Sequence, residues 1–222
     1  MILKRKKETT AQTIGEEIAN SITHGLGFVF SVVGFVFLLM NCIEKGTILH
    51  IVSCSIYGGS LLLLYMISTL YHSITHHVAK NVFRRLDHIS IYLLIAGTYM
   101  PLTLVVLKGY LGWTLFGIEC GLCLLGVIFK AIFGSRLSVI SSAFYLIMGW
   151  LAAFAFKAMI TALSIAGFNW ILIGGIFYSL GVIFFALDKK YKYAHAIWHV
   201  FVLSGSICHF FLVLLYIVPF SI

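Results

Sequence analysis

Residues 193–211 read YAHAIWHVFVLSGSICHFF, a run apolar enough to cross a membrane that still carries His195 and His199 one helical turn apart. A polar side chain inside a membrane-spanning helix is costly unless it has a polar partner or a function. Residues i and i+4 share one face of a helix and are separated by a rise of about 6 Å, so both imidazoles can approach one ion. This stretch indicates a transmembrane helix, and a metal site is the first hypothesis that it raises.

The composition of the whole chain supports this interpretation. The 222 residues are 61% hydrophobic and 10% charged, with only two prolines, and the mean hydropathy is +1.07. Water-soluble globular domains are far less apolar and carry about 25% charged residues. The composition therefore predicts a polytopic membrane protein.

The apolar runs predict an all-α integral membrane protein with a bundle of seven transmembrane helices. No linker or change of composition separates the runs, so we expect a basic cytoplasmic tail over 1–19 and one transmembrane domain over 20–222. The first run is too long for the apolar core of a signal peptide and is expected to remain in the mature protein. The predicted spans are roughly 20–42, 48–72, 86–107, 111–133, 139–157, 166–187 and 195–218.

The basic residues predict the orientation of the bundle. Twelve of the fifteen lysines and arginines fall before the first span or in the connections after the second, fourth and sixth spans. Because cytoplasmic connections are enriched in Lys and Arg, the N-terminus is predicted inside and the C-terminus outside. The net charge of +8 then reflects orientation, with some attraction to anionic membrane lipids, and no nucleic-acid partner is needed. The twelve are Lys4, Arg5, Lys6, Lys7, Lys80, Arg84, Arg85, Lys130, Arg136, Lys189, Lys190 and Lys192, against Lys45, Lys108 and Lys157 on the other side.

This topology brings polar residues from three spans to one depth near the inner face. His72 ends the second span, Asp87 begins the third, and His195 and His199 begin the seventh. Three neutral imidazoles with one open position are typical of a catalytic zinc site. Asp87 is then expected beside the water at that position as a proton acceptor, and Ser68, one turn from His72, as a hydrogen-bond donor to the water, to Asp87 or to a substrate carbonyl.

Chance spacing is the alternative to a metal site. Nine histidines in 222 residues give about 0.4 pairs at i and i+4 by composition alone, and short motifs produce such false matches. The convergence of His72 and Asp87 on the same side favours the metal. The segment HAIWH has Ala196 where HExxH zinc proteases have their glutamate, so a protease of that soluble type is not expected.

Several other polar residues have two interpretations or none. Glu17, Asn20 and His24 fall within an arc of about 60° on the helix entering the first span, where they either form a second layer around the ligands or cap and anchor the helix. His209 is expected to make a hydrogen bond between helices, and Glu119, inside the fourth span, has no assignable partner. His76 and His77 are expected in a solvated loop, and His88 is interpreted as a neighbour of Asp87 and not as a ligand. No disulfide is expected among the five cysteines, including the CxxC pair Cys120 and Cys123.

Five motifs in order resemble the bacterial hemolysin III proteins. That family is grouped with the progestin and adipoQ receptors, which include the adiponectin receptors, and with alkaline ceramidases. The resemblance covers nearly the whole chain. It implies a seven-helix bundle with the N-terminus inside, and a zinc ion on the histidines matching His72, His195 and His199 with the aspartate matching Asp87 on its water. The motifs are ExxNxxTHxxG (17–27), STLYH (68–72), LDHISIYLLIAGTYMP (86–101), YLIMGW (145–150) and HAIWHVFV (195–202).

The resemblance leaves three functional hypotheses open. The first is a zinc-dependent hydrolase of lipid amide bonds, with Asp87 as the acid/base and a lipid-like substrate inside the bundle. The second is a cytolysin that permeabilises membranes, in which zinc is structural. The third is a receptor or sensor whose ligand shifts the helix packing. Under all three we expect a multi-pass protein of a bacterial plasma membrane in contact with membrane lipids.

Overall fold

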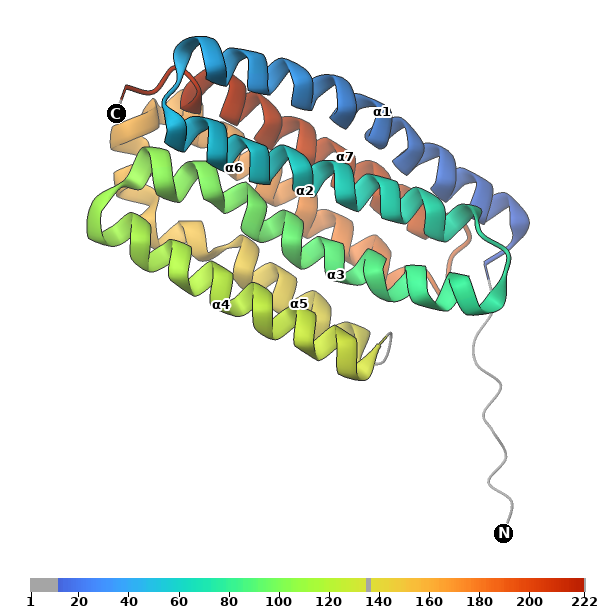
Figure 1. Cartoon of the computed structure of the whole chain (residues 1–222). Helices are drawn as coiled ribbons and strands as arrows, with labels where there is room; N and C mark the ends of the chain where they lie inside the picture. Colours follow the sequence, from blue (N-terminus) through green and yellow to red (C-terminus); the bar gives the residue numbers. More distant parts are fainter. Residues whose placement is uncertain (1–11, 135–136, 222) are drawn as a thin grey trace.

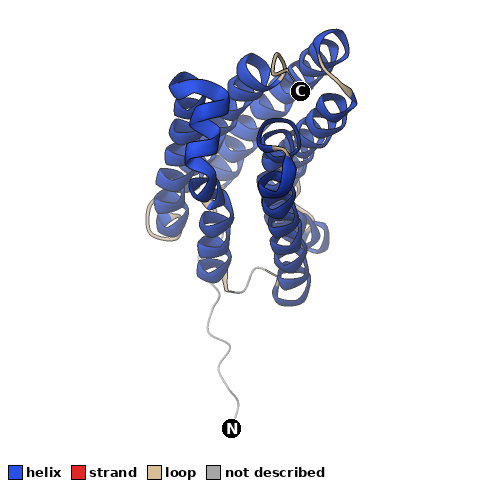
Figure 2. Cartoon of the chain, turned by 90° about the vertical axis from the view of Figure 1, so that its left-hand side faces the viewer, coloured by secondary structure: helices blue, strands red, loops and turns tan. Residues whose placement is uncertain are grey.

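The computed structural model describes residues 12–134 and 137–221, and within these ranges the chain is helical without any β-strand (Figure 2). The predicted basic cluster Lys4–Lys7, Arg136 and Ile222 lie outside the described residues. The long helices are α1 (Ile14–Lys45), α2 (Ile48–Ser73), α3 (His77–Pro101), α4 (Gly109–Phe133), α5 (Ser138–Gly149), α6 (Phe156–Leu187) and α7 (Ala194–Leu212). Short irregular helices follow α3, α5 and α7: the π-helix η1 (Leu102–Leu107), the 3₁₀-helix η2 (Leu151–Ala155) and the π-helix η3 (Val213–Ile217).

Six helical stretches in the described residues are long and apolar enough to cross a membrane. One of them, Val139–Leu187, has 49 residues and is interrupted at Ser164, which has φ 64° and ψ 170°. Trp150 Nε1 donates a hydrogen bond of 2.9 Å to Ser179 Oγ, although 29 residues of straight helix would separate them by about 43 Å. The chain therefore turns back on itself between these two residues.

The first helix begins earlier than the predicted span because its N-terminus is well capped. Glu16 N donates to Thr13 Oγ1 at 3.3 Å, and Thr13 N donates to Glu16 Oε2 at 2.9 Å. This reciprocal pair satisfies two backbone N–H groups that the first turn would leave unpaired. Residues 14–19, which we assigned to the tail, are therefore helical.

Two local predictions at the same end of the bundle were wrong. His77 is not a loop residue but the first residue of α3, and His76 Nδ1 accepts a hydrogen bond from Ala79 N at 3.4 Å at the helix start. Lys130 is not in a connection but in the last turns of α4, where it is buried. The error at His77 arises because helical backbone begins before the apolar run, whereas Lys130 already fell within the predicted span 111–133.

Helix α1 packs along both α2 and α7, and α6 packs along α7 (Figure 1). Glycines allow α1 and α2 to approach closely. A Cβ on Gly58 would lie 2.1 Å from the ring of Phe35, and one on Gly27 would lie 2.6 Å from the ring of Tyr65. Without a hydrophobic driving force in lipid, helices associate through such small-residue contacts.

Replacing Gly58 by Ala is expected to destabilise the protein, because the new methyl group overlaps Phe35. Overpacking of this kind costs about 1–3 kcal/mol. Gly59→Ala is the matched control, since no atom lies within 4 Å of its Cβ position and Ala favours a helix by up to about 1 kcal/mol. Thermal unfolding in detergent measures both variants. Equal midpoints for Gly58→Ala and Gly59→Ala would contradict the contact.

Candidate metal centre

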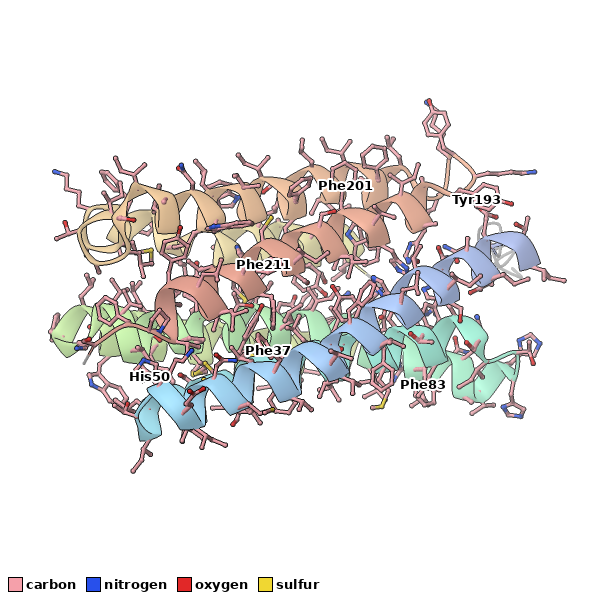
Figure 3. The ribbon with its side chains drawn as sticks, turned by 90° about the horizontal axis from the view of Figure 1, so that it is seen from above. Phe37, His50, Phe83, Tyr193, Phe201 and Phe211 are labelled. Atoms are coloured by element: carbon pink, nitrogen blue, oxygen red, sulfur yellow. The ribbon has the colours of Figure 1, made fainter. Side chains whose placement is uncertain are left out.

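Hydrogen bonds join the ends of α1, α2, α3 and α7 on one side of the bundle. Tyr193 N, just before α7, donates to Glu16 Oε1 at 3.0 Å. Lys80 Nζ of α3 lies 2.9 Å from Glu17 Oε1 of α1. Tyr193 and Phe83 are seen toward this end of the bundle in Figure 3, and His50 toward the opposite end. These hydrogen bonds bring side chains at the C-terminal end of α2 near side chains at the N-terminal end of α7.

His72 of α2 and His195 and His199 of α7 form a compact buried cluster. One ligand nitrogen from each lies within 4.8 Å of the others. The ring centroids are 5.2 Å apart for His72 and His195, 5.1 Å for His72 and His199, and 4.8 Å for His195 and His199. The i and i+4 pair of α7 does share a face, and α2 supplies the third imidazole.

Each of these histidines uses its Nδ1 for a hydrogen bond. His72 Nδ1 donates to Glu17 Oε2 at 2.8 Å, and His195 Nδ1 donates to Asp188 Oδ2 at 3.2 Å. His199 Nδ1 lies 3.3 Å from the Asn20 carbonyl oxygen and 3.1 Å from Thr23 Oγ1. Carboxylates and carbonyls of this kind orient histidines that bind metals and select their tautomer.

The Nε2 atoms of the same three histidines are buried and have no hydrogen-bond partner in the described part of the chain. A buried polar nitrogen without a partner costs about 1–3 kcal/mol. Three such nitrogens close together fit a zinc ion, which takes neutral imidazole nitrogens as ligands. The donor set is thus suited to the zinc that the sequence predicts.

Asp87 and Ser68 lie beside the cluster. Both side chains are buried, and Asp87 also lines an apolar cavity. Asp87 is connected to the group through His24, which lines the same cavity as Asp87 and stacks on His199. The predicted roles of Asp87 and Ser68 beside a metal-bound water stay predictions.

An apolar cavity extends from this group into the bundle. His24 and Asp87 line it at the cluster, and Tyr99 and His209 line it deeper in the bundle. The 12 residues from Asp87 to Tyr99 correspond to about 18 Å along α3. Most of the other lining residues are aliphatic or aromatic, as in pockets that bury apolar ligands.

The three polar residues of α1 lie around the histidines. Glu17 binds His72, and Asn20 contacts His199 through its backbone carbonyl while its side-chain Nδ2 donates to Gln12 Oε1 at 2.8 Å. The His24 ring stacks on His199 with centroids 3.4 Å apart and 11° between the planes. Of the two alternatives, this geometry favours the second layer around the ligands.

Sequence reasoning missed Asp188, Glu16 and the role of Thr23. Asp188 stands before α7 in the connection that follows α6, so an acidic residue seven positions ahead of His195 was the available signal. Thr23 lies in the motif that also contains His24, but only the crossing of α1 and α7 brings it to His199. Glu16 could be found from its spacing to Thr13, since Thr-x-x-Glu predicts a capping box.

The remaining predictions concern residues away from the cluster. His209 makes the expected hydrogen bond between helices, with Nε2 donating to the Ile171 carbonyl oxygen at 3.3 Å. Glu119 is completely buried, and neither carboxylate oxygen has a partner among the described residues. The five cysteines are free thiols.

Comparison with known proteins places this helical bundle in a family. The family model described as "Haemolysin-III related" matches residues 12–210. The hemolysin-3 homolog of Bacillus subtilis (strain 168) is 50% identical over 206 residues, covering 93% of this chain and 96% of the relative. Hemolysin-3 of Bacillus cereus is 46% identical over 217 residues, covering 98% and 99%. The human monocyte to macrophage differentiation factor is 29% identical over 217 residues, covering 92% and 86%.

The first two relatives align over almost their full lengths with a chain that has several membrane-spanning helices. The protein is accordingly a multi-pass protein of a bacterial cell membrane. From the match to the family model and the two close bacterial relatives, the chain belongs to the haemolysin-III-related family.

Proposed function

We propose that the protein is a zinc-dependent hydrolase that cleaves lipid amide bonds at the inner face of the membrane. The observation that carries this proposal is the group of three unpartnered Nε2 atoms together with the buried Asp87, which lines an apolar cavity beside His24, the ring that stacks on His199. A structural metal site needs neither the carboxylate nor the cavity. Convergent polar groups at the end of an apolar pocket are typical of a lipid-cleaving site.

The residues divide the reaction between them. His72, His195 and His199 would hold the zinc, which when bound polarises a carbonyl and makes water more acidic. Asp87 accepts the proton of the attacking water and passes it to the leaving amine nitrogen as the C–N bond breaks. Ser68 donates a hydrogen bond to the oxygen of the substrate carbonyl, and the cavity holds the acyl chain.

We infer that the chain crosses the membrane seven times. The 49 residues of Val139–Leu187 would extend about 73 Å as one helix, more than twice the roughly 30 Å hydrocarbon core. The interruption at Ser164 and the hydrogen bond from Trp150 to Ser179 support two crossings here. Together with the charge bias, seven crossings put the N-terminus and the histidine cluster inside and the C-terminus outside.

Permeabilisation of membranes is the second candidate, favoured by the names of the two Bacillus relatives. In that case zinc would stabilise the junction of α2 and α7 without any turnover. The two candidates differ in what Asp87 does, because leakage through a membrane needs no acid/base group.

The purified protein is expected to contain about one zinc per chain, as one three-histidine site predicts. His72→Ala, His195→Ala or His199→Ala should each lower zinc affinity by more than the roughly 10- to 100-fold that loss of an outer hydrogen-bond partner costs. Metal analysis by mass spectrometry measures the occupancy. His209→Ala, about 15 Å farther along α7, should keep the metal. Full occupancy in a His195→Ala, His199→Ala double variant would rule out the site.

A topology map is expected to place Arg84 and Lys190 in the cytoplasm and a C-terminal reporter outside. Reporter fusions or cysteine accessibility measure this in intact cells. A cytoplasmic C-terminus would mean an even number of crossings, and the inferred second crossing within Val139–Leu187 would then be wrong.

Asp87→Asn is expected to keep zinc but to reduce product release by about 100-fold or more, the usual scale for loss of a general acid/base. The measurement is fatty acid released from a lipid amide by purified protein in detergent. Dye-loaded liposomes provide the contrast. If wild type and Asp87→Asn release dye equally and no fatty acid forms, the cytolysin replaces the hydrolase.

A further inference from the structure

Two histidines in the wall of the apolar cavity have unsatisfied nitrogens. Neither ring nitrogen of His24 has a hydrogen-bond partner among the described residues, and the same is true of Nδ1 of His209. Both side chains line the cavity, His24 beside the metal centre and His209 deeper in the bundle. An unpaired buried nitrogen is costly in the dry interior of a membrane protein, so each position calls for a polar ligand atom.

The hydroxyl groups of the cavity wall are already engaged. Tyr99 donates to the Gly149 carbonyl oxygen at 2.9 Å, and Tyr145 donates to that of His88 at 2.9 Å. Tyr178 Oη lies 2.8 Å from Ser206 Oγ. Apart from Asp87, the cavity-wall atoms that lack a hydrogen-bond partner among the described residues are therefore nitrogens of His24 and His209.

His209 is oriented with its free nitrogen away from α6. A Cβ on Gly174 of α6 would lie 2.4 Å from Nε2 and 2.5 Å from Cδ2, so this edge of the ring faces that helix. In a five-membered ring, Nδ1 is the atom opposite the Nε2–Cδ2 bond. Eleven residues bring the helix back to within about 20° of the same direction, so His209 shares a face of α7 with the cavity-lining Trp198.

The hydrogen bond that His209 already makes defines what its free nitrogen can accept. Nε2 must be the donor in the bond to the Ile171 carbonyl oxygen, because a carbonyl oxygen only accepts. In the neutral imidazole Nδ1 then carries a lone pair and no proton. Its complementary ligand atom is an O–H group.

We propose that the cavity selects a long acyl chain that carries a hydroxyl group along its length, with His209 Nδ1 as the acceptor. The carbonyl end of the chain lies at the metal centre, near His24, and this proposal rests on the proposed function only for that orientation. His209 is about 15 Å from His199 along α7. An extended chain advances about 1.25 Å per carbon given C–C bonds near 1.5 Å, so the hydroxyl falls near the twelfth carbon.

Binding of two fatty acids tests the proposal without any turnover. The probes are octadecanoic acid and its 12-hydroxy derivative, each titrated into purified zinc-loaded protein in detergent. Wild type should prefer the hydroxylated acid by about 3- to 10-fold, the range for one neutral hydrogen bond. His209→Phe, which keeps a planar ring but no acceptor, should abolish the preference. Equal affinities in wild type, as when a water already occupies Nδ1, would overturn the proposal.

Three further variants keep the result interpretable. His209→Gln, which retains an acceptor oxygen, should restore part of the preference if His209→Phe fails to fold. His88→Phe removes the imidazole of a half-buried residue whose buried Nδ1 is also unpartnered among the described residues, outside the cavity wall, and should leave the preference intact. Asp87→Asn should lose hydrolysis but keep the preference. A preference that persists in folded His209→Phe would assign the hydroxyl to another residue, and hydrolysis that fails with the preference kept would overturn only the hydrolase.

Discussion

The candidate metal centre depends on the hydrogen bonds that its three histidines make through Nδ1. A neutral imidazole has one donor and one acceptor nitrogen. Once Nδ1 donates to Glu17 or Asp188, the lone pair lies on Nε2, the nitrogen left free to bind an ion. Helices α2 and α7 supply the three imidazoles. The orientation of the rings also requires Glu17 of α1 and Asp188 in the turn before α7.

The first two turns of α1 therefore contribute more to the site than to the transmembrane span. Glu17 joins His72 to Lys80, and Glu16 accepts from the backbone N–H of Tyr193. Tyr193 has φ 60°, a left-handed conformation that costs a non-glycine residue about 1–2 kcal/mol. The hydrogen bond from its N–H to Glu16 helps to hold this turn, which starts α7 in the direction that points His195 toward α2.

Much of this arrangement follows from the sequence, and the reasons for the exceptions are physical. The apolar runs predicted each helix, and helical spacing with the charge bias brought His72, Asp87, His195 and His199 together. The ends of α1 and α3 could not be found in this way, because polar residues such as His77 continue a helix without adding to an apolar run. Nor could Asp188, since its approach to His195 depends on a tertiary turn at Tyr193. The start of α1, by contrast, could have been predicted from the capping-box pattern of Thr13 and Glu16.

One helix serves both ends of the cavity. On α7, His195 and His199 belong to the histidine cluster. Trp198 and His209 lie on an adjacent face of the same helix and line the cavity. Because both sets belong to one helix, a shift of α7 would move the proposed reacting position and the proposed chain-binding position together. The contact of His209 with Gly174 and its bond to Ile171 hold that helix against α6, while Glu16 holds its first turn against α1. If the proposed hydroxylated chain binds here, the length between its carbonyl carbon and its hydroxyl is set by the rise of a single helix and not by loops.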